Sequence, residues 1–138
     1  MVITQEIRLQ TRGNFDIKDI TQEITMAVRE SGLASGTVTV FTPSATSGLT
    51  TIEYESGALA DLERLFDEIV SPEREYQHNL RWHDGNGHSH VRAALIGPSI
   101  TIPFVEGSLT LGTWQQVILI DCDNRARSRR LVVQVMGE

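Results

Sequence analysis

The sequence has a single cysteine, no long apolar run and no excess of basic residues over its 138 positions. Because Cys122 has no partner, an internal disulfide is excluded. No segment approaches the roughly 18 consecutive apolar residues of a membrane-spanning helix, so we expect no membrane partner. Lys and Arg number 12 against 18 Asp and Glu, which gives a net charge of −6. This balance argues against nonspecific binding to nucleic acid, which needs a basic surface.

The N-terminal residues and the lone cysteine both bear on location. Residues 2–9 alternate apolar and polar side chains and carry charge, which predicts a strand with one wet face rather than a signal peptide. Cys122 ends the apolar run that begins at Val117, and we interpret it as a packed thiol in preference to a nucleophile. Together these features favour a cytoplasmic protein.

Length and periodicity predict one α+β domain over residues 1–138. Apolar residues at spacings of three and four predict amphipathic helices over residues 16–31 and 57–70. Residues 90–97 fit either a short helix or a strand. Alternating or β-branched runs predict strands at residues 2–9, 36–42, 49–54, 99–105 and 128–136, and one or two long strands at residues 108–122. Because hairpins dominate the second half, we expect a mixed or antiparallel β-sandwich with two to three helices.

All four histidines lie in one window, between Tyr76 and His90. Histidine is the commonest metal ligand. Residues two apart point the same way on an extended chain, so an extended segment would let His88 and His90 meet one metal ion. With His78 as a third ligand, this would be the three-ligand arrangement of a catalytic zinc site. We therefore predict a metal site at His78, His88 and His90. The alternative is a polar loop whose histidines bond to backbone and water.

Candidate residues for catalysis and anion binding lie around this window. Asp84 could orient a metal-bound imidazole or act as an acid or base, and Glu53 could do so from the end of its strand. The loop at residues 44–48 offers hydroxyl and backbone N–H groups to phosphate oxygens, although it lacks P-loop spacing. Each has a structural alternative: Asp84 could simply form the glycine turn, Glu53 could be an exposed strand end, and the loop at residues 44–48 could only connect two strands. We assign catalytic roles to Glu53 and Asp84, and substrate or anion binding to Thr46, Ser47, Asn86 and Arg92.

Two further features each fit more than one role. The final hairpin contains a cluster of arginines, which indicates a solvated face or an anion site: Arg125, Arg127, Arg129 and Arg130. Trp114 interrupts an aliphatic strand, and a buried indole needs a partner for its N–H. We expect Trp114 in the core or at a subunit interface, in preference to stacking on a ligand.

Several runs of this sequence resemble the YjbQ-like family, and the likeness spans nearly the whole chain. They are Ser44-Ala-Thr-Ser-Gly-Leu-Thr-Thr-Ile-Glu-Tyr-Glu55, Tyr76-Gln-His78, Asp84-Gly-Asn-Gly-His-Ser-His-Val-Arg-Ala93, Gly97-Pro-Ser99 and Gly107-Ser-Leu-Thr-Leu-Gly-Thr-Trp-Gln115. Within the first of these runs, the sequence Gly-Leu-Thr-Thr-Ile-Glu-Tyr-Glu resembles that of the archaeal-type branch of the family. Many relatives have a histidine near the position of Ser44, so the resemblance implies that a ligand from this loop is lost or replaced here.

The resemblance implies an α+β sandwich that assembles as a homotrimer, with a polar site near a subunit interface. It also implies secondary thiamine-phosphate synthase activity, in which a pyrimidine diphosphate joins a thiazole phosphate and pyrophosphate leaves. Charge on a leaving diphosphate is commonly stabilised by a divalent ion, so we expect zinc or magnesium as cofactor and a small phosphorylated metabolite or anion as ligand. The alternatives are a non-catalytic trimer that binds a metal or metabolite, and a purely structural trimer.

Overall fold

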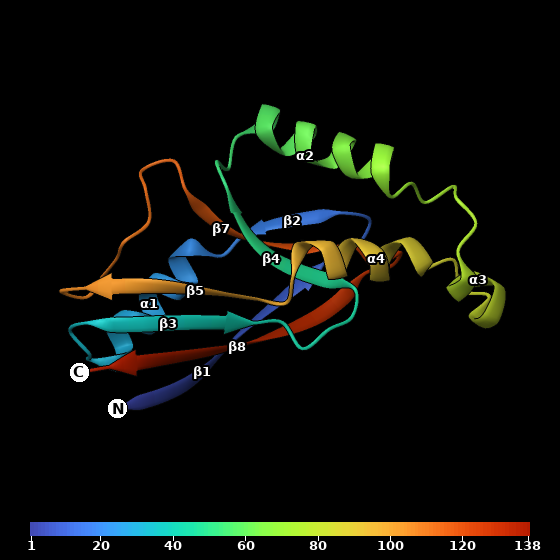
Figure 1. The fold of residues 1–138 in the computed structure, drawn as a ribbon. Coiled ribbons are helices and arrows are strands. Elements are labelled where there is room, and N and C mark those ends of the chain that lie inside the picture. The colour runs from blue at the N-terminus through green and yellow to red at the C-terminus, as the bar shows by residue number, and fades with distance from the viewer.

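The computed structural model describes all 138 residues and contains two antiparallel sheets and four helices (Figure 1). The larger sheet has the strand order β1-β8-β3-β5-β6. Its strands are β1 (Val2–Thr11), β8 (Arg127–Gly137), β3 (Gly36–Phe41), β5 (Ser99–Val105) and β6 (Ser108–Leu109). The smaller sheet has the order β2-β7-β4, with β2 (Asp16–Asp19), β7 (Gln116–Asp121) and β4 (Ser47–Ile52). The predicted α+β class with antiparallel strands is confirmed.

The helices are α1 (Thr21–Ser31), α2 (Ser56–Ile69), α3 (Gln77–Trp82) and α4 (Gly87–Ile96). The sequence did not predict α3, because a six-residue helix is too short to show a helical period. The predicted helix over 16–31 begins instead at Thr21, since the preceding residues pair with β7 as the strand β2. The ambiguous segment at 90–97 is helical and starts earlier, at Gly87.

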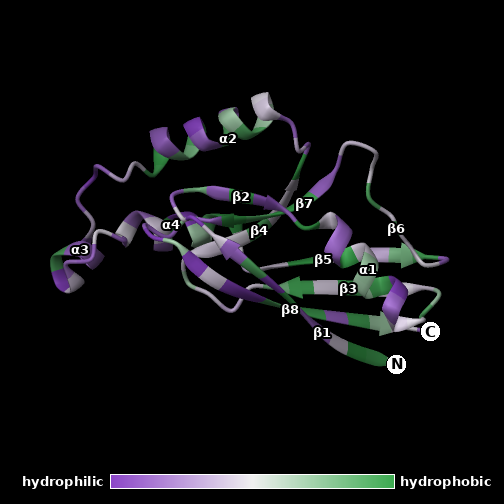
Figure 2. Ribbon diagram, turned by 180° about the vertical axis from the view of Figure 1, so that it is seen from behind, coloured by the Kyte–Doolittle hydropathy of each residue, from purple (hydrophilic) through white to green (hydrophobic).

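The central strand β7 is buried on both faces and separates two apolar cores. Because side chains alternate along a strand, Val117 and Leu119 enter the larger core with α1 and the larger sheet, whereas Ile118 and Ile120 enter the smaller core beneath α2. A strand covered on both sides has no need of polar positions, which explains its unbroken apolar run. By contrast, hydrophilic and hydrophobic bands alternate along β8, which has one wetter face (Figure 2).

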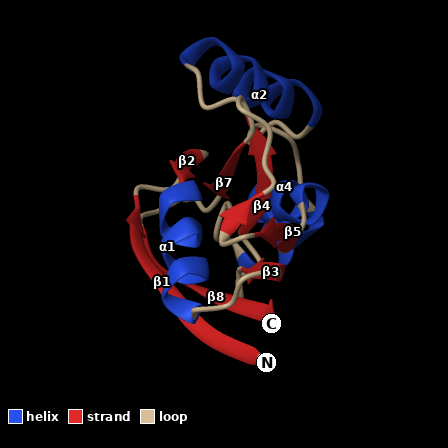
Figure 3. Ribbon diagram, turned by 90° about the vertical axis from the view of Figure 1, so that its left-hand side faces the viewer, coloured by secondary structure: helices blue, strands red, loops and turns tan.

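Helix α2 lies outside both sheets and is set apart from the rest of the chain (Figures 1 and 3). Its N-terminus is capped by Glu55, whose carboxylate accepts hydrogen bonds from the first backbone N–H groups of the helix. Phe66 is its one buried residue and packs against Phe15 with ring centroids 5.3 Å apart. The smaller core therefore depends on few contacts from α2.

The segment at 108–122, for which the sequence left one or two strands open, forms two strands, β6 and β7, with a loop between them. The side chain of Gln115 bridges this loop, accepting from the backbone N–H of Gly112 at 3.1 Å and donating to Thr51 at 3.3 Å. Trp114 stands on the loop and is 72% exposed, so the expectation of a core position in this chain was wrong. Its position at a subunit interface stays a prediction.

Candidate functional site

Helices α3 and α4 meet at their first turns because residue 87 is glycine. A Cβ atom there would lie 2.5 Å from Cβ of Tyr76 and 3.0 Å from Oδ1 of Asn79. Only glycine permits so close an approach. Its backbone N–H donates to Asn79 Oδ1 at 2.8 Å and fixes the contact. This junction brings His78 of α3 beside His90 of α4.

The imidazole rings of His78 and His90 lie 4.3 Å apart between centroids, at an interplanar angle of 40°. Nδ1 of His78 is buried and makes no aligned hydrogen bond, but it lies 3.3 Å from Oδ1 of Asp84. That carboxylate oxygen also accepts from the backbone N–H of Asn86 at 3.1 Å, so the turn holds it in place. Asp84 therefore lies beside an imidazole, and its role as an acid, a base or an orienting carboxylate stays a prediction.

The structure separates His88 from this pair. The predicted three-histidine geometry needed an extended chain at 87–90, and this was wrong because α4 already begins at Gly87. Side chains two apart on a helix diverge by about 200°. His88 is 6% exposed and packs near Tyr76, with ring centroids 6.4 Å apart. No three metal-binding side chains of the chain converge on one point.

A pocket of about 280 Å³ adjoins His90. On one side it is lined by α4, and on the other by the loop that precedes β4 and by the first residue of β4. The lining residues are chiefly Ser44, Ala45, Ser47, His90, Ala93 and Ala94. Helix and strand approach closely because residue 48 is glycine: a Cβ atom there would lie 2.6 Å from Cγ2 of Ile96. His90 is the only titratable residue of the lining, and no carboxylate belongs to it.

The hydroxyl groups of the loop differ in where they point. Ser47 is 1% exposed, and its Oγ lies 2.8 Å from Oγ1 of Thr42. Thr46 is turned inward and donates to Asp123 Oδ2 at 2.9 Å. Ser44 is half-buried at the pocket wall, where its Oγ accepts from the backbone N–H of Thr46 at 3.1 Å. Of the predicted anion-binding hydroxyls, Ser47 lines the pocket and Thr46 does not.

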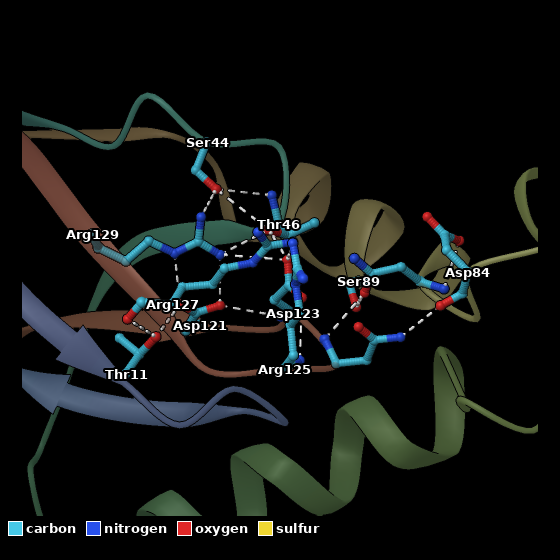
Figure 4. Close-up of polar contacts among 12 residues, drawn as sticks. Thr11, Ser44, Thr46, Asp84, Ser89, Asp121, Asp123, Arg125, Arg127 and Arg129 are labelled. Atoms are coloured by element: carbon cyan, nitrogen blue, oxygen red, sulfur yellow. Dashed lines mark hydrogen bonds and ion pairs between the residues drawn. The ribbon is translucent and has the colours of Figure 1, made fainter. Parts of the chain in front are cut away.

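Behind this loop lies a buried network of charges that the sequence did not predict (Figure 4). Asp121 and Asp123, at the end of β7, are 0% and 1% exposed. Arg129 donates to both carboxylate oxygens of Asp121, from Nε at 2.6 Å and from Nη2 at 2.8 Å. Arg127 lies 3.1 Å from Asp123, and Thr11 donates to Asp121 at 2.5 Å. Two carboxylates and two guanidinium groups thus balance one another.

The environment keeps these groups charged. Burial opposes ionisation of Asp123, but hydrogen bonds from Thr46 and Arg127 hold its pKa below the usual value. Burial likewise opposes the charge on Arg129, and its bonds to Asp121 outweigh that effect and raise its pKa. Between the two acids, Cys122 is 1% exposed, which confirms the predicted packed position, and burial raises the pKa of its thiol to about 12.

Arg92 and Asn86, both predicted to bind substrate or an anion, instead form hydrogen bonds that connect segments of the chain. Arg92 is 3% exposed; its Nε donates to the carbonyl of Val70 at 3.0 Å and its Nη2 to Asp67 at 2.9 Å, so its guanidinium holds α2 and does not line the pocket. Oδ1 of Asn86 accepts from the Ser89 hydroxyl and from the backbone N–H of Asn124 at 3.2 Å. These contacts give neither side chain a place in the pocket lining.

Glu53, the second predicted catalytic acid, follows β4 at the end opposite the pocket. It is exposed and lies six positions after Ser47 along the chain. At the rise of a strand, this amounts to about 20 Å. The structure therefore does not bring Glu53 together with Asp84 or the histidine pair.

Fold and site together define an antiparallel α+β protein with a histidine and hydroxyl pocket. The chain belongs to the YjbQ-like family, described as "UPF0047 protein YjbQ-like", whose model matches residues 5–138. A "UPF0047 protein" from Methanothermobacter thermautotrophicus is 37% identical over 99% of this chain and 94% of its own length. Another from Archaeoglobus fulgidus is 33% identical over 95% of this chain and 99% of its own. The relatives thus include archaeal proteins.

Solved structures have the same fold. A protein of unknown function from Sulfolobus solfataricus aligns with a TM-score of 0.94 at 31% identity, over 100% of this chain and 99% of that one. A hypothetical protein from Aeropyrum pernix aligns with a TM-score of 0.91 at 29% identity, over 99% of each chain. None of the helices in this chain is long and apolar enough to cross a membrane.

Proposed function

We propose that the pocket between α4 and the loop at residues 44–48 binds a small phosphorylated metabolite beside His78 and His90. The observation that carries this proposal is the 4.3 Å pair of imidazoles, one of which lines a pocket whose other polar side chains are hydroxyls. Imidazole N–H and hydroxyl O–H groups can both donate to phosphate oxygens, and no carboxylate in the lining would repel them. An acidic chain can therefore hold an anion at this point.

We further propose that His78 and His90 hold a divalent ion. Asp84 lies 3.3 Å from Nδ1 of His78, which is how a carboxylate orients a metal-binding imidazole and leaves Nε2 for the ion. Imidazole nitrogens suit zinc, whereas magnesium prefers oxygen ligands, so of the two expected ions the residues favour zinc. His88 is too far around α4 to join them.

A zinc site with two protein ligands needs further ligands, and we propose that a second copy of the chain or the substrate supplies them. This agrees with the homotrimer that we expect. Two tryptophans support a subunit interface, because Trp114 is 72% and Trp82 is 64% exposed and tryptophan is enriched at protein interfaces. The native mass of the purified protein tests this assembly, and a monomeric mass would contradict it.

For the reaction, we propose the thiamine-phosphate synthase chemistry that the resemblance implies. The pyrimidine diphosphate would lie with its phosphates against His90 and the loop hydroxyls, and pyrophosphate would leave as the thiazole nitrogen bonds to the pyrimidine methylene. A bound divalent ion would supply charge stabilisation for the leaving group. The side chains of this chain would bind and orient the diphosphate.

One observation favours the second candidate, a binding protein without turnover. Glu53 lies about 20 Å along β4 from Ser47 of the pocket lining. Asp84 contacts His78 and the backbone N–H of Asn86. The pocket therefore has no free carboxylate to act as a general base. A protein that binds a metal or a phosphorylated metabolite needs no such group.

Growth of a thiamine-phosphate synthase auxotroph separates the two candidates. Expression of this chain should restore growth without thiamine, and His90→Ala should abolish it. His83→Ala is the matched control, because His83 is exposed and caps the C-terminus of α3 outside the pair. If the wild-type chain is soluble and does not restore growth, the enzyme proposal fails. Growth that survives both His78→Ala and His90→Ala would remove these residues from the reaction.

A further inference from the structure

The hydroxyl of Ser44, at the pocket wall, is connected to the buried charge network by hydrogen bonds through Arg129. Asp121 fixes the guanidinium of Arg129 by two hydrogen bonds, at 2.6 and 2.8 Å. Such a bidentate pair leaves the guanidinium little freedom to turn. Its remaining nitrogen, Nη1, donates to Oγ of Ser44 at 2.8 Å. The side chain of Arg129 is 12% exposed, so it acts on the pocket mainly through Ser44.

The two donors at Ser44 determine what its hydroxyl can do next. A serine oxygen has two lone pairs and one hydrogen. Nη1 of Arg129 and the backbone N–H of Thr46 both donate to this oxygen, at 2.8 and 3.1 Å. Both lone pairs are thereby occupied, and the hydroxyl hydrogen is left over. Ser44 can then bind a further group only by donating to it.

The nearest acceptor within the chain competes poorly for this hydrogen. Oγ1 of Thr46 lies 3.5 Å from Oγ of Ser44, at the outer limit of a hydrogen bond. It already accepts from Nη2 of Arg129 at 2.8 Å and gives its own hydrogen to Asp123. A ligand oxygen in the pocket is the better acceptor, and a charged oxygen is the best because the neighbouring guanidinium polarises the hydroxyl.

We propose that Ser44 is a specificity-determining hydrogen-bond donor for an anionic oxygen of the pocket ligand, and that Arg129 is the residue that positions and polarises it. The inference rests on the proposed function, because it concerns the same pocket. It explains how a lining without lysine or arginine selects an anion: a guanidinium that is neutralised by Asp121 sets the direction of a serine O–H. Phosphate and diphosphate oxygens have the required chemistry.

Titration calorimetry with inorganic pyrophosphate tests the donor. Ser44→Ala removes the hydroxyl, and with it the acceptor of Arg129 Nη1, but keeps both hydrogen bonds between Arg129 and Asp121. It should weaken pyrophosphate binding about 10- to 100-fold. Ser44→Thr keeps an O–H and should retain most of the affinity. Ser128→Ala is the matched control, since it deletes an exposed hydroxyl that bonds to Gln10 on the neighbouring strand.

The outcomes separate this inference from the proposed function. If the wild-type protein binds pyrophosphate and Ser44→Ala binds it equally well, the donor role of Ser44 is overturned and the pocket assignment stands. If the wild-type protein does not bind pyrophosphate even with zinc present, the proposed function itself is contradicted. Equal losses in Ser44→Ala and Ser128→Ala would also overturn the specific role of Ser44.

The positioning role of Arg129 is tested in the intact protein by nuclear magnetic resonance. The side-chain Nη signals of Arg129 are assigned through its own backbone, so no substitution of this buried residue is needed. Pyrophosphate should shift these signals in the wild-type protein and leave them unmoved in Ser44→Ala. An Arg129 signal that does not respond in the wild-type protein would overturn the positioning role. So would an equal response in both proteins, because the contact would then bypass Ser44.

Discussion

The imidazole rings of His78 and His90 lie 4.3 Å apart between centroids and are tilted by 40°, although His78 lies in the first turn of α3 and His90 lies in α4. Their separation depends on Gly87, which lets the first turn of α4 approach Tyr76 and Asn79. The pair is therefore a product of helix packing. Its partner surface, the loop at residues 44–48, is placed by a second close approach at Gly48.

Gly48→Ala should loosen this second contact. The added Cβ would lie 2.6 Å from Cγ2 of Ile96, so α4 must move away from β4 and the pocket must widen. We expect a loss of about 1–3 kcal/mol in the free energy of unfolding, and weaker pyrophosphate binding. Chemical denaturation measures the first and calorimetry the second. Gly112→Ala is the control, because its Cβ would have no neighbour nearer than 3.8 Å. Equal stability of the two variants would refute the close packing at Gly48.

Replacing Arg92 distinguishes its observed position from its predicted role in anion binding. Arg92→Met keeps the apolar stem and removes the hydrogen bond to the carbonyl of Val70. A buried carbonyl without a partner costs about 1–3 kcal/mol. We expect faster hydrogen exchange in α2 and unchanged pyrophosphate affinity. Arg64→Met serves as control, since Arg64 is exposed on α2 and pairs with Asp61. Lost affinity with unchanged exchange in α2 would restore the anion-binding interpretation.

We expect the buried His88 to make the free energy of unfolding depend on pH. Burial, and next the charge of Arg92, lower its pKa from the ordinary value of 6.5. As pH falls below 6.5, the unfolded chain gains a proton at this residue and the folded chain does not, so the free energy of unfolding decreases. The loss ends once the pH passes below the lowered pKa of the folded state.

Denaturation at about pH 7.5 and about pH 5.5 measures this effect, because carboxylates stay ionised across the interval. The wild-type protein should be less stable at the lower pH, and His88→Leu should lose part of that difference. His83→Leu, at an exposed position, should retain the wild-type difference. A pH dependence that is the same in all three proteins would show that His88 is not responsible.

Much of the fold follows from local pattern. The apolar run from Val117 to Ile120 predicted a strand, and the spacing of Leu62, Phe66 and Ile69 predicted α2. The wrong predictions of secondary structure arise where pairing with a distant strand determines the conformation of a segment. Residues 16–19 show a helical pattern, yet they form β2 because β7 offers an edge for antiparallel pairing. The six residues of α3 are too few for any period to be visible.

The sequence predicted where in the chain the candidate site lies better than how its side chains are arranged. The clustering of histidines pointed to the correct window, but whether His88 joins His90 depends on whether the chain is extended or helical there, and short runs leave that open. Asp121 ends β7 and Asp123 follows it. Acids at the end of a strand usually mark an exposed turn, so little in the sequence indicated that these two are buried. Their pairing with Arg129 arises where β7 of the smaller sheet meets β8 of the larger sheet, and a single sequence does not reveal how two sheets meet.

The central claim is that His78 and His90 form a metal-binding pair at the edge of an anion pocket. The most direct measurement is a crystal structure of the protein, purified without a histidine tag and soaked in zinc, with anomalous scattering recorded on both sides of the zinc absorption edge. We predict an anomalous peak between the two imidazoles, within about 2.0–2.1 Å of one nitrogen of each ring. No peak at this position at a zinc concentration that fills other sites, or a peak at His88 instead, would contradict the account.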